Sequence, residues 1–247
     1  MIVKAYKTHK VKVGDDLLEV LDKYLPRLKE RDVVVVTSKI VSICQGRVIK
    51  NDGKVSKLDL VKKDAQYYLP EKYLRFGVNL TVTNNVFIAS AGIDESNGYG
   101  NFILWPKDPM KEAERIWKHL RKKHKVKNLG VVITDSHLTP LRRGVTGFGI
   151  AWCGFAPLKS YIGKPDIFGR NLRLEMTNLV DSVAASAVFE TGEGGEQTPI
   201  VVINDPPHLK FKERPPTKAE IKEMTIPLDE DIYSGLLTSV KWKRGRA

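Results

Sequence analysis

The stretch VVITDSHLTPLRRG, residues 131–144, joins the pattern of a core strand to a run of polar side chains. Its first four residues, 131–134, are β-branched, which is typical of the end of a buried β-strand. The polar residues that follow are Asp135, Ser136, His137, Arg142 and Arg143. A carboxylate, a hydroxyl and two fixed positive charges beyond a rigid strand predict a site for a metal and a polyanionic ligand.

The rest of the chain has the composition of a globular protein. It contains 247 residues, of which 42% are hydrophobic and 28% are charged, so disorder of the whole chain is excluded. The formal net charge of +12 favours an anionic partner. The basic runs 118–127 and 241–246 lack interleaved aromatic residues, so we interpret them as solvated surface and expect no nucleic acid partner.

The sequence predicts a cytoplasmic protein without a membrane segment. The N-terminal residues contain no long apolar run, so they do not resemble a signal peptide. The longest purely aliphatic run, 33–36, is far too short to span a bilayer. Cys44 and Cys153 have no neighbouring residues at zinc-site spacing and are interpreted as reduced thiols.

Working outward from residues 131–144, apolar spacing predicts alternating strands and helices. The predicted strands lie in residues 31–41, in a hairpin over 80–98 that turns at Asn84 and Asn85, in a glycine-interrupted run at 144–158, and in 198–203. The predicted helices are 14–28 with Asp15 as N-cap, 54–76, 109–124, 174–191 with Met176 in its apolar stripe and Gly192 as C-cap, and a short acid-capped helix within 229–240. Because hairpins mix with the helices irregularly, we expect an α+β fold with mixed sheets.

Three segments place acidic residues beside the ends of predicted elements. The residues are Asp94 after a strand, Asp135 with Ser136 after another, and Glu193 in the glycine-rich loop TGEGGEQTP. Together they offer the hard oxygen ligands that Mg²⁺ or Mn²⁺ accepts, and the glycines would let backbone N–H groups approach phosphates. Alternatively, each acid forms only a turn or a cap. His137 is interpreted as a solvent-exposed loop residue, with proton transfer as its alternative role.

The chain has neither the GxxxxGK[ST] nor the GxGxxG pattern, which excludes a P-loop or a Rossmann nucleotide site. Five segments instead resemble the coenzyme F-420:gamma-glutamyl ligase family, in order and in approximate spacing. They are VVVVTSKIVSICQGR, AGIDESNG, VVITDSHLTPLRRGVTGFGIA, YIGKPDIFGR and TGEGGEQTPIVVI. The resemblance spans about residues 14–204, so we treat 1–247 as a single ligase-like unit whose residues 205–247 form a proline-rich connection and a short helix.

The resemblance implies an α+β fold of two interlocked lobes and a homodimer. It also implies an acid–amino-acid ligase that adds L-glutamate to a carboxylate of a deazaflavin coenzyme precursor. GTP, or alternatively ATP, would be the cosubstrate, with Mg²⁺ or Mn²⁺ as the metal. The acceptor carboxylate would take the γ-phosphoryl group to form an acyl phosphate, which the glutamate amine would then attack.

The resemblance also implies roles for individual residues. The metal ligands fall on Asp94, Asp135, Ser136 and Glu193, and the catalytic residues on Asp135 and Arg142. The nucleotide contacts fall on Ser38, Lys39 and Asn97, on Gly192, Gly194 and Gly195 in the loop 191–198, and near residues 8–11.

Four residues depart from the family pattern. Ile43 and Gln45 stand where the family carries lysine and glutamate, and Leu138 and Thr139 stand where it carries glycine and arginine. Two cations that would meet phosphate or substrate are thereby absent. The acceptor could therefore be another molecule, such as a folate. A further alternative is a non-catalytic descendant that binds nucleotide or nucleic acid.

Overall fold

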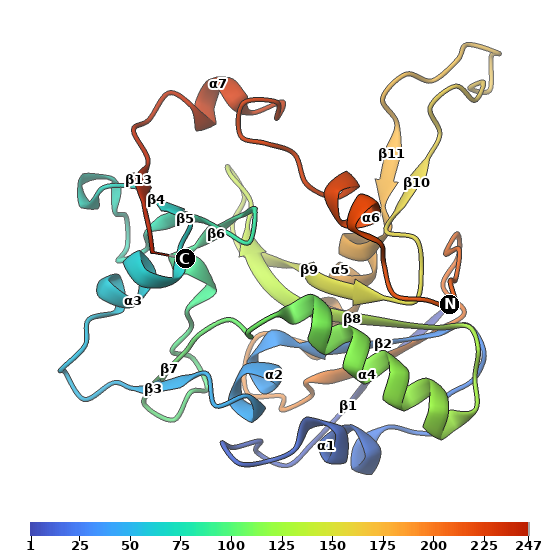
Figure 1. Cartoon of the computed structure of the whole chain (residues 1–247), viewed down its shortest axis with the longest axis horizontal. Coiled ribbons are helices and arrows are strands. Elements are labelled where there is room, and N and C mark those ends of the chain that lie inside the picture. Colours follow the sequence, from blue (N-terminus) through green and yellow to red (C-terminus); the bar gives the residue numbers. More distant parts are fainter. Residues whose placement is uncertain (247) are drawn as a thin grey trace.

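The protein is built around two β-sheets of different size (Figure 1), and the computed structural model describes residues 1–246. The larger sheet has the strand order β1-β12-β2-β8-β9. Its strands are β1 (Ile2–Tyr6), β12 (Ile200–Asn204), β2 (Asp32–Thr37), β8 (Leu129–Leu138) and β9 (Val145–Cys153). Strands β2 and β8 are parallel and the other neighbours are antiparallel, so the expected α+β fold with mixed sheets is confirmed.

Helices cover both faces of the large sheet, which explains the uninterrupted valine run in β2. The helices are α1 (Leu17–Tyr24), α2 (Ser38–Cys44), α4 (Pro109–His124) and α5 (Leu179–Thr191). Successive side chains of a strand point to opposite faces. Val34 and Val36 accordingly pack with α1, α2 and α4, whereas Val33 and Val35 pack with α5. Both faces of the strand are buried, so it needs no polar alternation.

Glycines in β9 let helix α5 approach the large sheet closely. A methyl group on Gly147 would lie 2.5 Å from the Ala184 carbonyl oxygen, and one on Gly149 would overlap Val180. The Gly149 backbone N–H donates to the Asp181 carboxylate at 2.9 Å, in the first turn of α5. The predicted close approach of the backbone in the glycine-interrupted run is therefore confirmed.

Residues 48–104 form most of a second, smaller lobe, which we call the small lobe. Its four-stranded sheet has the order β13-β4-β5-β6, in which β13 (Lys243–Arg244) comes from the far end of the chain, and it lies beside the pair β3 and β7. The elements are β3 (Val48–Lys50), α3 (Lys57–Asp64), β4 (Tyr67–Tyr68), η1 (Glu71–Tyr73), β5 (Leu80–Thr83), β6 (Val86–Ala89), η2 (Ser90–Gly92) and β7 (Asn101–Ile103). The hairpin turn is confirmed, since Asn84 and Asn85 both have positive φ, 49° and 60°.

The helix predicted over residues 54–76 is correct only in part. Helix α3 ends at Asp64, and Tyr67 and Tyr68 form strand β4 against β5. Pairing with the strand β5 decides the structure beyond Asp64 rather than local helical preference.

The C-terminal segment runs from the large sheet back to the small lobe (Figure 1). It contains α6 (Lys218–Glu223), α7 (Ser234–Leu237) and β13 (Lys243–Arg244). The predicted solvated surface at 241–246 is confirmed, because its basic side chains are exposed, although Lys243 and Arg244 also pair with β4 through their backbone. The short C-terminal helix is present, but Tyr233 precedes it without a side-chain cap, so the expected acidic cap is wrong.

Two further predictions about helix ends need correction, and one is confirmed. Asp16, not Asp15, caps α1, because its side chain accepts the N–H groups of the first turn; Asp15 bonds His9 instead. Met176 lies in strand β11 (Met176–Asn178) rather than in α5. Gly192 ends α5 with a φ of 68°, as predicted.

A hairpin of β10 (Leu158–Ser160) and β11 (Met176–Asn178) projects from the molecule as an arm, which we define as residues 158–178 (Figure 1). The basic run 118–127 includes the last turn of α4, where Lys123 pairs with Asp22 and Arg121 with Glu213. Within residues 1–246, no helix combines the length and the apolarity that a membrane span requires.

Candidate active site

Asp135 and Ser136 lie inside strand β8 and not in a loop beyond it. They pair with Phe148 and Gly147 of β9, and the strand continues to Leu138. The strand end predicted at Thr134 is therefore wrong. The register shifts between Ile133 and Thr134, and such a bulge bends a strand and changes the direction of its side chains. The strand continues past the buried core because the polar residues keep their backbone pairing with β9.

The Asp135 carboxylate is held at both oxygens. Oδ1 accepts the backbone N–H of Ser136 at 2.8 Å, and Oδ2 accepts the indole N–H of Trp105. Burial raises the pKa of Asp135 to about 6. The two N–H donors oppose this rise, whereas the nearby Asp94 carboxylate adds to it. A cation bound beside the Asp135 carboxylate would therefore stabilise its charged form.

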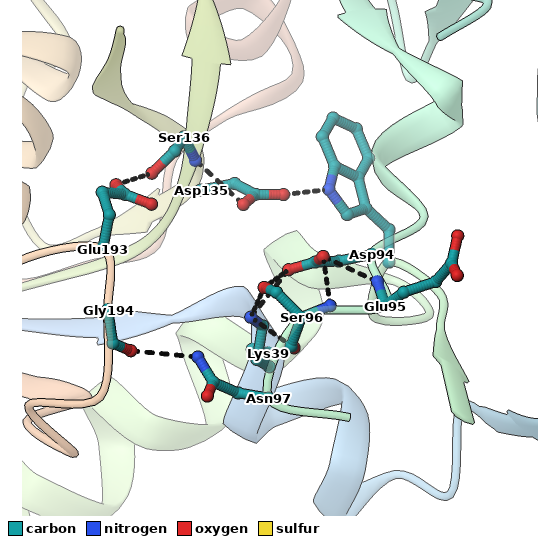
Figure 2. A network of polar contacts seen from close by, with 10 residues as sticks. Lys39, Asp94, Glu95, Ser96, Asn97, Asp135, Ser136, Glu193 and Gly194 are labelled. Carbon is teal, nitrogen blue, oxygen red and sulfur yellow. Dashed lines mark hydrogen bonds and ion pairs between the residues drawn. The ribbon is translucent and has the colours of Figure 1, made fainter. Parts of the chain in front are cut away.

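Asp94 comes from the small lobe, directly after η2, where Ser90 and Ala91 have positive φ. Its Oδ1 accepts the backbone N–H groups of Glu95 and Ser96 at 2.6 and 2.8 Å. Its Oδ2 forms an ion pair with Lys39 at 2.7 Å (Figure 2). Burial alone would raise the pKa of Asp94, but Lys39 and Ser96 outweigh it and lower that pKa below its usual value.

Asp94 and Asp135 line one small cavity between the two lobes. It measures about 20 Å³, which is enough for one water-sized particle. Its lining residues are Ser38, Lys39, Ser42, Gly92, Asp94, Ile103, Leu104, Trp105 and Asp135. The Ser42 hydroxyl is fully buried and has no hydrogen-bond partner. The cavity is therefore lined by side-chain oxygen atoms with unused hydrogen-bonding capacity, which suits a small polar ligand.

Glu193 lies next to this cavity rather than in its lining. Its carboxylate accepts a hydrogen bond from the Ser136 hydroxyl at 2.5 Å (Figure 2). One residue further, the Gly194 carbonyl accepts the side-chain N–H of Asn97 at 3.0 Å. The three acidic segments predicted from the sequence therefore converge, although 99 residues separate Asp94 from Glu193.

The glycine-rich loop already holds an anionic group of its own. The Gly194 backbone N–H donates to the Glu196 carboxylate at 2.8 Å, which folds back over Gly192. At its far end the loop is joined to the N-terminal segment, where Gln197 and Thr8 exchange two hydrogen bonds. Backbone N–H groups that bind a carboxylate in this way are also suited to phosphate oxygens.

Arg142 is placed differently from the other predicted site residues. It lies with Arg143 in the exposed turn between β8 and β9, and its backbone N–H bonds to Thr139. Leu138 and Thr139 lie in the same exposed end of the hairpin. Across residues 1–246, no hydrogen bond or ion pair joins the Arg142 side chain to Asp135. Its catalytic role stays a prediction.

His137 is part of strand β8, so its interpretation as a loop residue is wrong. It is half-buried and packs on the Phe148 ring, with the ring centroids 4.9 Å apart. Burial lowers the pKa of His137, which makes it a neutral packing residue at neutral pH.

The donor atoms are of the chemical type that binds a hard divalent cation, but their spacing in this structure is not that of a metal site. Asp94, Asp135, Ser136 and Glu193 supply oxygen atoms only, the preferred ligands of Mg²⁺ and Mn²⁺. Within the described part of the chain, no three acidic, histidine or cysteine side chains lie at metal-ligand spacing. Lys39 contributes positive charge at Asp94, on the margin of the cavity that a cation would enter.

Comparison with known proteins identifies the family. The sequence model described as F420-0:Gamma-glutamyl ligase matches residues 5–205. The chain belongs to this family. It is 34% identical over 208 residues to the coenzyme F420:L-glutamate ligase of Archaeoglobus fulgidus, covering 78% of this chain and 82% of that protein.

Two further relatives carry the same name. The Methanosarcina barkeri protein is 32% identical over 240 residues, covering 90% of each chain. The Methanocaldococcus jannaschii protein is 29% identical over 232 residues, covering 88% of this chain and 90% of its own. The F420-0:gamma-glutamyl ligase family consists of ligases that form C–N bonds, so the expected enzyme class and the resemblance are confirmed.

Among the lining residues that the sequence analysis missed, two carry polar side-chain groups. Trp105 and Ser42 both line the cavity, and Trp105 bonds Asp135 directly. Neither stands in an acidic or glycine-rich segment. The apolar run FILW before Pro106 looks like a core strand, and Ser42 directly follows the stretch 31–41 that was predicted to hold a strand, whereas the structure forms helix α2 there. The sequence contains no spacing signal that links either residue to Asp135.

Proposed function

We propose that this protein joins the amino group of L-glutamate to a carboxylate of coenzyme F420-0, driven by a nucleoside triphosphate and supported by Mg²⁺ or Mn²⁺. The observation that carries the proposal is the cavity shared by Asp94 and Asp135 in a chain of this family. Two carboxylates from different lobes beside one water-sized space would suit a divalent ion, which would supply positive charge to the phosphate groups of the nucleotide.

In the proposed reaction, the acceptor carboxylate attacks the γ-phosphorus of the nucleotide, the bond to the β-phosphate oxygen breaks, the nucleoside diphosphate leaves, and an acyl phosphate is formed. The glutamate amine then attacks the acyl carbon, phosphate leaves, and an amide bond remains. When bound, the metal neutralises charge on the phosphate oxygens. Asp94, Asp135, Ser136 and Glu193 would hold it. Lys39, on the margin of the same cavity, would contact a phosphate oxygen with its ammonium group.

The glycine-rich loop is the proposed phosphate contact of the nucleotide. Gly192, Gly194 and Gly195 leave the backbone accessible, and the Gly194 N–H already donates to the Glu196 carboxylate. Asn97 ties this loop to the Asp94 segment through the Gly194 carbonyl. Nucleotide binding would therefore require Glu196 to leave the loop, exchanging one anion for another. GTP is the proposed nucleotide, with ATP as the alternative.

A different carboxylate acceptor, such as a folate, is the second candidate. The observation that favours it is the loss of two cations of the family pattern. Ile43, which is half-buried, stands where the family carries lysine, and Thr139, which is exposed, stands where it carries arginine. Fewer cations change which anionic acceptor is bound, without altering the carboxylates at the cavity.

Isothermal titration with GTP and with ATP, each with and without Mn²⁺, tests the proposal. We expect metal-dependent binding of one nucleotide. The protein is then incubated with that nucleotide, Mn²⁺, L-glutamate and either F420-0 or a folate, and the product mass is measured. A mass increase of one glutamate on F420-0 supports the proposal, whereas an increase on folate alone supports the second candidate. Absence of nucleotide binding would contradict both and favour a binding protein for other anions.

A homodimer is also proposed, with the arm as part of its interface. Ile167, Phe168 and Leu174 on this arm are each more than 80% exposed. Three large apolar side chains on one projecting hairpin are typical of an interaction surface. Sedimentation velocity of the purified protein measures the oligomeric state directly.

A further inference from the structure

Trp105 connects the small lobe to the strand that carries Asp135. It follows β7, is 5% exposed, and its indole N–H donates to Oδ2 of Asp135. The other carboxylate oxygen accepts the Ser136 backbone N–H. With one donor on each oxygen, the carboxylate cannot turn about its own axis without losing a hydrogen bond.

The position of the Trp105 indole is itself fixed from three sides. The Trp105 carbonyl accepts the side chain of Arg47 at 3.0 Å, and Arg47 pairs with Asp64 at 2.6 Å. The Phe148 ring packs beside the indole at 6.1 Å between ring centroids. On the remaining side, Gly92 leaves the indole its space, because a methyl group at this residue would overlap the ring.

The other tryptophans of the chain do not show this arrangement. Trp117 donates to the Leu129 backbone carbonyl at 2.8 Å, and Trp242 donates to the Leu237 carbonyl at 2.6 Å. The Trp152 indole N–H is buried without a partner. Trp105 is thus the one tryptophan, among the four in the chain, whose N–H meets a carboxylate.

We propose that Trp105 is a positioning residue that orients Asp135 toward the cavity shared with Asp94 and thereby sets the affinity of the site for a divalent cation. This inference rests on the proposed metal-dependent function. The indole and the Ser136 N–H each use one lone pair of the carboxylate, and the remaining lone pairs are free for the cavity. Mutation of a residue that hydrogen-bonds a metal ligand, without contacting the metal itself, typically changes the metal affinity by about 10–100-fold.

The Trp105→Phe variant tests the inference, because it removes the N–H donor and keeps an aromatic ring. Free Mn²⁺ is measured by electron paramagnetic resonance during titration of the intact protein. We expect Mn²⁺ affinity to fall about 10-fold or more in this variant. The matched control is Trp117→Phe, which also loses a buried indole hydrogen bond but lies away from the cavity. Its Mn²⁺ affinity is expected to stay within about twofold of the wild type.

A second measurement keeps Trp105 in place and therefore does not depend on the folding of Trp105→Phe. The indole ¹H–¹⁵N resonances are assigned, and Mg²⁺ is added. The Trp105 resonance is expected to shift with Mg²⁺ and in Asp135→Asn, while the Trp117 resonance is unchanged.

The outcomes separate this inference from the proposed function. If the wild type binds Mn²⁺ and Trp105→Phe binds it with equal affinity, the role of Trp105 alone is overturned. The same holds if the Trp105 resonance shifts neither with Mg²⁺ nor in Asp135→Asn. Absence of Mn²⁺ binding by the wild type, with and without nucleotide, overturns the metal-dependent function and this inference with it.

Discussion

Replacement of Gly147 by alanine should separate helix α5 from the large sheet. Gly147 pairs with Ser136 across the β8–β9 hairpin, directly beneath α5. A methyl group there would lie 2.5 Å from the Ala184 carbonyl oxygen and 2.5 Å from a methyl group of Val188. Contacts below 3.0 Å are essentially never observed for Cβ atoms, so the helix backbone must move by at least about 0.5 Å.

The expected loss of stability follows from the type of contact. A flexible side chain could yield by changing rotamer, but the Ala184 carbonyl belongs to the helix backbone and can move only with the helix. Overpacking of this kind lowers the free energy of unfolding by about 1–3 kcal/mol. Because the contact is with the helix backbone, we expect Gly147→Ala to fall in the upper part of this range, at about 2–3 kcal/mol. For a chain of this size, the melting temperature should fall by about 4–12 °C.

Differential scanning calorimetry measures this change, with Gly235→Ala as the control. Gly235 lies in α7, has no atom within 4 Å of an added methyl group, and should lose no stability on substitution. Because α5 leads directly into the loop that carries Glu193, Mn²⁺ affinity should also fall in Gly147→Ala. A melting temperature within about 1 °C of the wild type would show that α5 does not pack on β9 as closely as described.

Three other variants test separate parts of the structure. Asp135→Asn should abolish Mn²⁺-dependent turnover and lower stability by only about 1–2 kcal/mol, because one of two N–H donors loses its acceptor while a buried charge is removed; full activity would refute the site. Glu220→Gln should destabilise the protein by about 1–2 kcal/mol at pH 7, since hydrogen bonds from Arg214 hold the pKa of Glu220 far below its usual value. That contribution is present above the unfolded pKa near 4.3 and disappears as the pH falls through the folded value, so the difference in urea midpoints should narrow below about pH 4; a constant difference down to pH 2 would contradict the ion pair. Phe168→Asp should weaken the proposed homodimer in sedimentation velocity experiments, and an unchanged dissociation constant would remove the arm from the interface.

Elements with a strong local pattern were predictable from the sequence. Helix α4 matches the predicted bounds 109–124, because its apolar side chains recur at helical spacing and bury one face. The Asn84–Asn85 turn was predictable, because both positions require positive φ, which asparagine tolerates. In each case the interactions that decide the structure lie within one or two turns of the chain.

Elements decided by distant partners were not predictable in the same way. Tyr67 and Tyr68 form a strand only because β5 lies beside them, and Lys243 and Arg244 extend that sheet from the far end of the chain. Strand β8 likewise continues past Thr134 because β9 pairs with it through the bulge. A bulge changes the register without leaving a mark in the hydrophobic pattern of β8 itself.

The candidate site shows the same division between residue type and geometry. Asp94, Asp135 and Glu193 could be selected from the sequence, because acids beside strand ends and glycines are recognisable locally. Their convergence depends on packing between the two lobes, since Asp94 belongs to the small lobe and the other two to the large one. Trp105 acquires its role only through that packing, which is why no local pattern revealed it.

The spacing of the two cavity carboxylates is therefore a property of the contact between lobes. Asp135 is fixed to the large sheet by its strand pairing, whereas Asp94 is fixed to the small lobe by its bonds to the next two backbone N–H groups. Lys39 of α2 bonds Asp94, and Trp105, two residues after β7, bonds Asp135, so a side-chain contact joins each carboxylate to an element beyond its own lobe. A movement of one lobe against the other must strain both of these contacts. Because of these two crossed contacts, the relative position of the two carboxylates and the arrangement of the two lobes change together.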